Sequence, residues 1–215
     1  DSPINFQVKR LTVEELNFSN YIFKDNLITS SYKDDLFELH ILNNELGGKI
    51  SIPLTEEDTI AIDLNFININ NIDNNNGSRS AFLNLYNELS FEMIFRTKSI
   101  VYNSRDYGSW SFTLTKDDQS LIMDNLMGVY GKWGLTYDAD EVSRLIISRE
   151  GLGWKTSLDS RAYSGSPEKA FKQVGIEPNF EMDTFSMDVS VNWSSLPWEV
   201  DYGNIIGDVD LNIKG

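Results

Sequence analysis

The sequence predicts an all-β protein, an antiparallel β-sandwich with at most one or two short helices. Apolar and polar residues alternate with a period of two in several separate segments, as expected of strands that bury one face. Clusters of Asn, Asp and Gly, which favour turns, lie between those segments. At 215 residues and 40% hydrophobic content, the chain suffices for one β-sandwich domain spanning residues 1–215.

The predicted strands follow one another along the chain. Residues 1–50 are either opening strands of the sandwich or a separate arm. Half-buried strands are predicted in the alternating segments 50–54, 59–67, 90–96, 109–115, 185–193 and 207–215. The clearest is 185–193, whose apolar face carries Phe185, Met187, Val189, Val191 and Trp193. Each segment is expected to turn its apolar side toward a core.

Helical signals are few. In residues 166–175, Ser166 is placed as the N-cap, Pro167 at the first helical position and Gly175 as the stop, so a short helix is predicted there. Residues 80–89 place apolar side chains at helical spacing. For that segment a helix and a strand or loop stay equally open.

Composition excludes several classes of function. Eighteen basic and 33 acidic residues give a net charge of −15, which repels phosphate backbones, so no nucleic-acid partner is expected. There is no cysteine, which excludes thiolate metal sites and thiol nucleophiles. No apolar stretch approaches the roughly 20 residues of a membrane helix, so no membrane span is expected. A start at Asp1 without a signal peptide is compatible with a processed secreted protein or with a shortened chain, and an extracellular or cell-surface location is predicted.

The order of four segments resembles a known family. These segments are "LSFEMIFRTKS", "GSWSFTL", "GKWGLTYDADEVSRLIIS" and "IIGDVDLNIKG". Together they are similar to a concanavalin-like jelly roll of the laminin-G type, over about residues 80–215. The resemblance implies that Trp133, Leu135 and Tyr137 face the core and that 138–141 is the turn of a hairpin. The segment 159–179 is longer than the family's usual connection.

Aromatic residues are the first candidates for a binding site, because ring faces stack on sugars while nearby polar groups fix orientation. Four aromatic residues fall in segments predicted to be irregular and are the predicted ligand-binding residues: Trp154, Tyr163, Trp198 and Tyr202.

Carboxylates are the other candidates, since the single imidazole, His40, has no nucleophile motif around it. If the protein is an enzyme, two flanking carboxylates of a glycosidase would come from Glu92, Glu181 and Asp183. No cofactor is expected, with calcium as the one alternative. Its candidate ligands are Asp73, Asp138, Asp140 and Asp208, although the spacing of an EF-hand is not met.

The leading hypothesis is a non-enzymatic binding or adhesion module that recognises a glycan or a protein through loops at the sandwich edge. Two alternatives stay open. One is a structural component of a larger assembly, such as a virion, a tail or a cell surface, in which the chain forms an oligomer. The other is a carboxylate-dependent glycoside hydrolase.

Overall fold

The computed structural model describes residues 6–18, 21–55, 59–69, 76–136, 143–177 and 181–215. Most of these residues lie in β-strands, and two short α-helices occur among them, which confirms the prediction of an all-β protein with few helices. The chain divides into two compact units, Asp1–Tyr107 and Gly108–Gly215. Each unit is described separately below.

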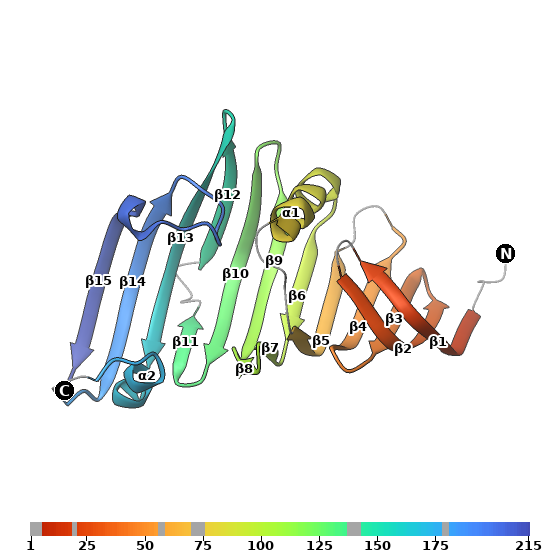
Figure 1. Cartoon of the computed structure of the whole chain (residues 1–215), viewed down its shortest axis with the longest axis horizontal. Coiled ribbons are helices and arrows are strands. Elements are labelled where there is room, and N and C mark those ends of the chain that lie inside the picture. The colour runs from red at the N-terminus through yellow and green to blue at the C-terminus, as the bar shows by residue number, and fades with distance from the viewer. Residues whose placement is uncertain (1–5, 19–20, 56–58, 70–75, 137–142, 178–180) are drawn as a thin grey trace. The chain divides into compact units, whose positions relative to one another are not determined.

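Unit 1, Asp1–Tyr107, is built on an antiparallel meander in which each strand pairs with the next along the chain. Its strands are β1 Phe6–Phe18, β2 Tyr21–Lys33, β3 Leu36–Leu42, β4 Leu46–Pro53 and β5 Ile60–Ile69 (Figure 1). Residues 6–18, 21–33, 36–42 and 46–53 are therefore strands of this sheet.

After β5 the pairing becomes parallel. Helix α1, Asn76–Glu88, leads to β6, Met93–Thr97, which runs parallel to β5. The short β7, Ile100–Tyr102, also pairs with β5 in parallel, and β8, Arg105–Asp106, pairs with β7. Parallel neighbours need a crossover connection, and α1 supplies it.

Helix α1 resolves the open choice for residues 80–89 in favour of a helix. Phe82, Tyr86 and Leu89, spaced by four and three residues, are all buried. The rings of Phe82 and Tyr86 are 6.1 Å apart between centroids. Residues three and four apart lie on one side of a helix, so burial of this stripe holds α1 in place.

A buried pair of asparagines, Asn26 and Asn43, links the first strands of unit 1 through side-chain hydrogen bonds. The Asn26 side chain is fully buried, and its Nδ2 donates to the carbonyl oxygens of Val13 at 3.2 Å and Phe23 at 2.7 Å. Asn43 Nδ2 donates to Asn26 Oδ1 at 2.7 Å. The Oδ1 atom of Asn43 accepts the backbone N–H of Leu46 at 2.6 Å. These bonds join β1, β2 and the turn before β4.

Unit 2, Gly108–Gly215, is an antiparallel sheet throughout its described strands. The strands are β9 Ser109–Lys116, β10 Ser120–Tyr130, β11 Trp133–Thr136, β12 Arg144–Glu150, β13 Gly153–Ser164, β14 Thr184–Trp193 and β15 Ile206–Lys214 (Figure 1). Helix α2, Pro167–Gln173, connects β13 to β14, and a 3₁₀ turn, Tyr202–Asn204, precedes β15.

The hairpin implied for residues 131–148 is wrong. Among the described residues, β11 and β12 do not pair with each other; each pairs with both β10 and β13. They therefore occupy one position in the sheet, one after the other. Asp138 and Asp140 lie between them and outside the described residues.

The core of unit 2 lies on the apolar face of its sheet. Trp133, Phe171 and Phe185 pack edge to face, with ring centroids 5.1 to 5.6 Å apart. Trp133 Nε1 donates to the carbonyl oxygen of Ala170 in α2 at 2.8 Å. The predictions that Trp133 faces the core and that residues 166–175 form a short helix are thus confirmed, with Pro167 at the helix start.

Strand β15 differs from its prediction as a half-buried strand. All nine of its residues are exposed, and the apolar Val209, Leu211 and Ile213 are 50%, 60% and 45% accessible. Its one partner in the described chain is β14. The strand is thus a sheet edge, which leaves its apolar side chains with neighbours on one side only.

Candidate functional site

The polar face of unit 2 gathers charged side chains from three neighbouring strands. The register places Arg161 of β13 opposite Asp188 of β14, and Asp188 opposite Asp210 of β15. In the adjacent row, Ser190 lies between Asp159 and Asp208. Residues directly opposite each other point to the same side of a sheet. These residues line a shallow hollow of about 350 Å³, called the acidic hollow here, whose lining is Ser143, Asp159, Ser160, Arg161, Asp188, Val189, Ser190, Asp208 and Asp210.

Arg161 and Asp188 form a two-pronged ion pair in this hollow. Arg161 Nε donates to Asp188 Oδ1, and Arg161 Nη2 donates to Oδ2 at 2.9 Å. Hydrogen bonding from the guanidinium lowers the pKa of the Asp188 carboxyl below its ordinary value. Arg144, the cross-strand neighbour of Asp159, is in turn paired with Asp124. Both arginines of this face are therefore paired with carboxylates other than Asp159.

Three carboxylates of the hollow lack a paired cation in the described part of the chain. Asp159 Oδ1 accepts a hydrogen bond of 2.6 Å from Ser190 Oγ, which is neutral. Asp208 and Asp210 have no side-chain hydrogen bond or ion pair within the described residues. Asp210 also lies directly opposite Asp188, and like charges in that position destabilise a sheet. The hollow therefore carries negative charge that no cation among the described residues compensates.

An apolar patch on the same face lies next to the hollow. Val129, Gly134 and Tyr163 are cross-strand neighbours in one row, and Tyr163 lies two residues after Arg161 on β13. A Cβ atom on Gly134 would come within 2.3 Å of Tyr163 Cε1, so the ring lies over this glycine. Met127, Val129 and Tyr163 are 45%, 50% and 44% exposed. These three residues are called the apolar patch.

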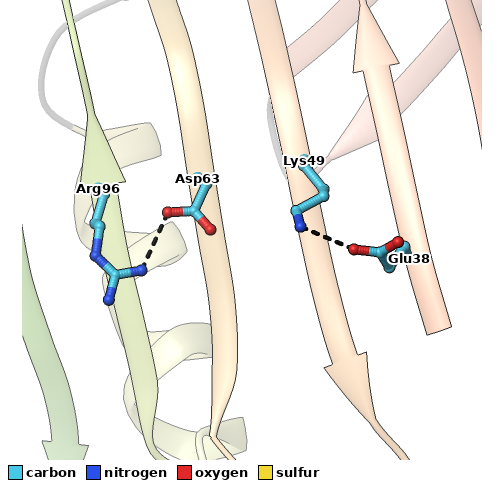
Figure 2. A network of polar contacts seen from close by, with 4 residues as sticks. All are labelled: Glu38, Lys49, Asp63 and Arg96. Atoms are coloured by element: carbon cyan, nitrogen blue, oxygen red, sulfur yellow. Dashed lines mark hydrogen bonds and ion pairs between the residues drawn. The ribbon is translucent and has the colours of Figure 1, made fainter. Parts of the chain in front are cut away.

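A row of charges in unit 1 shows a different arrangement (Figure 2). Glu38, Lys49, Asp63 and Arg96 come from the successive strands β3, β4, β5 and β6, with alternating sign. Lys49 Nζ is 2.8 Å from Glu38 Oε1, and Arg96 Nη1 is 3.1 Å from Asp63 Oδ1. The hydrogen bond from Lys49 lowers the pKa of Glu38 and raises that of Lys49. Each of these four charges has an oppositely charged partner. The row therefore links neighbouring strands by ion pairs and has no net charge that could bind a ligand.

The structure distributes the predicted aromatic residues over separate places. Trp154 and Tyr163 both lie in β13, so their placement in irregular segments is wrong. Nine residues separate them, which puts them on opposite faces and roughly 30 Å apart along the strand. Trp198 and Tyr202 lie between β14 and β15 and are 46% and 83% exposed. Of the two residues in β13, Tyr163 is the one on the face that carries the acidic hollow.

The predicted carboxylates are also dispersed. Asp208 lines the acidic hollow. Glu92 belongs to unit 1, where its Oε1 accepts a hydrogen bond of 2.9 Å from Thr59 Oγ1. Glu181 and Asp183 are exposed residues just before β14. Asp73 lies outside the described residues, as do the two aspartates between β11 and β12. Within the described ranges, no three or more His, Asp or Glu side chains are grouped to hold a metal ion.

Sequence reasoning missed Asp159, Arg161, Asp188 and Asp210. The signal was present as polar residues alternating with apolar ones in 185–193 and 207–215. Those residues become a cluster only when the register between β13, β14 and β15 is known.

No family model, curated protein or solved structure matches this chain. Of the helices in the described part of the chain, neither has the length and apolar character needed to cross a membrane.

Proposed function

We propose that the protein is a non-enzymatic binding module whose acidic hollow and apolar patch receive a basic segment of a protein partner. The observation that carries this proposal is the set of three carboxylates, Asp159, Asp208 and Asp210, without a paired cation beside three exposed apolar side chains. A lysine or arginine of the partner supplies the missing positive charge. Its apolar neighbours cover Met127, Val129 and Tyr163.

The electrostatics of the whole chain support a cationic partner. A net charge of −15 attracts basic proteins over long distances and raises their rate of association. The hollow is shallow and lies on an open sheet face, which suits a protein surface better than a small buried ligand. Because the attraction is between exposed charges, binding weakens as salt is added.

A glycan is the second candidate ligand for the same face. The half-exposed ring of Tyr163 lies near the carboxylates and the guanidinium of Arg161, and this combination of a ring face with polar groups suits a sugar. An adhesive role at an extracellular or cell-surface location belongs to this proposal.

The finer fold assignment, a concanavalin-like or laminin-G-like jelly roll, is also part of the proposal. Antiparallel strands and few helices support it. A jelly roll further requires two sheets joined by Greek-key connections. Most described strands of each unit pair with a neighbour in the chain, so the assignment requires a crystal structure in which strands cross between two sheets, and a single sheet in that crystal structure would refute it.

The binding test uses oligolysine as the probe and calorimetry as the measurement. The triple variant Asp159→Asn, Asp208→Asn, Asp210→Asn removes the uncompensated charge of the hollow while keeping side-chain size. Three exposed charge pairs at about 0.2–1 kcal/mol each predict a loss of affinity of roughly 3- to 150-fold. The matched control removes three exposed charges elsewhere, in Glu88→Gln, Asp118→Asn and Glu177→Gln.

An equal loss in the triple variant and its control would show that oligolysine follows net charge alone, and the proposal would fail. For the glycan candidate, a glycan array is screened with the native protein and with Tyr163→Ala. Binding that disappears with Tyr163→Ala and survives in the triple variant would move the assignment from a protein to a glycan.

A further inference from the structure

The edge strand β15 carries its charges in an ordered sequence along one face. Asp208, Asp210, Asn212 and Lys214 alternate with the apolar residues and therefore share the polar face. The face is acidic at the start of the strand and basic at its end. In an antiparallel copy of the same strand this order is reversed, so opposite charges meet.

We propose that β15 pairs with β15 of a second copy of this chain, antiparallel and about a two-fold axis at Leu211. In this register Leu211 lies opposite its symmetry mate, and Val209 lies opposite Ile213 of the other copy. On the polar face, Asp208 lies opposite Lys214 of the other copy, and this pair occurs twice because of the symmetry. The partner that fits this surface is thus the chain itself, through addition of a strand to a sheet edge.

Other registers fit less well. A two-fold axis at Asp210 places that carboxylate against its own copy and leaves Lys214 opposite Ile206. An axis at Asn212 pairs only residues 210–214 of β15. Shifting the pairing by one residue would set apolar side chains against polar ones. The axis at Leu211 is the register that combines like faces, opposite charges and seven paired residues, 208–214.

The alternating backbone geometry of β15 permits this axis. In an antiparallel ladder, directly opposed residues alternate between pairs that exchange backbone hydrogen bonds and pairs that do not. A two-fold axis passes through the centre of either kind of pair. The pairing also places the exposed apolar groups of β15 side by side with those of the second copy, where cross-strand contacts shield them from water.

Pairing through β15 shares one residue, Asp208, with the proposed binding of a basic partner and otherwise uses other residues. It rests on Leu211 and Lys214, which do not line the acidic hollow. It also supplies Asp208 with a cation, Lys214 of the second copy. Lys214→Glu leaves the hollow unchanged and should lose pairing but keep oligolysine binding. The double variant Asp159→Asn, Asp210→Asn keeps Asp208 and should lose part of the oligolysine binding but still pair, so the two proposals can fail separately.

Sedimentation over a range of protein concentrations tests the pairing. We expect the native chain to approach twice the mass of one chain as concentration rises. Lys214→Glu sets two carboxylates against each other at both ends and should raise the dissociation constant about tenfold. Adding Asp208→Lys to this variant restores opposite charges in the same register and should restore pairing. Lys169→Glu, the same charge change on the exposed face of α2, is the control and should pair like the native chain.

Cysteine trapping tests the register directly, because the chain has no cysteine of its own. Leu211→Cys places two thiols across the two-fold axis, within disulfide reach. Val209→Cys and Ile213→Cys place equivalent thiols four residues out of register, about 14 Å apart, which is too far for a disulfide. We expect Leu211→Cys to form a covalent dimer at least tenfold faster than either control. An equimolar mixture of the two controls should cross-link about half as fast as Leu211→Cys, because half of its dimers are mixed and only mixed dimers bring two thiols opposite each other.

Two results would overturn the proposal. One is a chain that keeps the mass of a single copy at every concentration. The other is a dimer in which the three cysteine variants cross-link at equal rates, because that dimer would use another surface or register. Circular dichroism of each variant, unchanged from the native spectrum, shows that the sheet itself is intact.

Discussion

Replacing Asn26 with alanine should destabilise unit 1 strongly. The substitution removes three hydrogen bonds, two donated by Asn26 Nδ2 and one accepted by its Oδ1. It leaves the carbonyls of Val13 and Phe23 and the Nδ2 atom of Asn43 without these partners in a buried site. At about 0.5–1.5 kcal/mol for each bond, the free energy of unfolding should fall by about 3 kcal/mol, with a range of roughly 1.5–4.5 kcal/mol.

Urea unfolding followed by circular dichroism measures this loss. With a slope of about 2 kcal/mol per molar urea, a loss of about 3 kcal/mol lowers the midpoint by about 1.5 M. The control is Asn44→Ala, which alters an exposed neighbour in the same turn and should change stability by less than about 0.5 kcal/mol. If Asn26→Ala costs no more than Asn44→Ala, the buried pair is not what holds β1, β2 and the turn together.

The same variant tests the prediction of a single domain. All five tryptophans lie in residues 108–215, so tryptophan fluorescence reports on unit 2, whereas circular dichroism reports on both units. If the chain unfolds as one domain, Asn26→Ala lowers both midpoints equally. If the fluorescence midpoint stays at its native value while the circular dichroism changes, the two units unfold separately.

Two further predictions concern the candidate site and the charge row of unit 1. Gly134→Ala should lower the free energy of unfolding by about 1–3 kcal/mol, because the added Cβ meets the Tyr163 ring. In a Tyr163→Ala background the ring is absent, so the same change should have almost no effect on thermal unfolding. Lys49 lowers the pKa of Glu38 in the folded state. The ion pair therefore contributes its full stabilisation at pH values above the ordinary pKa of a glutamate, about 4.3. This contribution is lost as the pH falls through the lowered pKa of Glu38 in the folded state. Lys49→Met should therefore flatten the acid side of the pH–stability curve by up to about 1 kcal/mol, given the exposure of both side chains; an unchanged acid limb in urea titrations would contradict this.

The strands that could be predicted from the sequence are those whose pattern is local. Alternation in 185–193 is a property of that segment alone, and β14 spans Thr184–Trp193. Helix α2 was predictable for the same reason, since Pro167 and Gly175 mark its ends within ten residues. Alternation alone could not show that β15 is exposed, because burial of one face depends on what lies beside the strand and over it.

Pairing partners and register could not be predicted from local pattern. The segments that became β11 and β12 have the alternation of hairpin arms, yet both pair with β10 and β13. The acidic hollow needs residues from β13, β14 and β15 in one register, and a slip of a single residue would turn Asp188 to the opposite face. Trp154 and Tyr163 were missed as strand residues because glycines precede the first and follow the second, at Gly153 and Gly165.

The order of the strands also determines the conformational entropy that the chain loses when its loops close during folding. From β1 to β5, and again in unit 2, most strands pair with a strand adjacent in the chain, so short loops close at low entropic cost. The parallel pairing of β5 with β6 is different, because it forms only after the chain has passed through α1. The largest loop-closure cost among the described pairings of unit 1 therefore falls on this one crossover, since the pairings from β1 to β5 join strands that are adjacent in the chain.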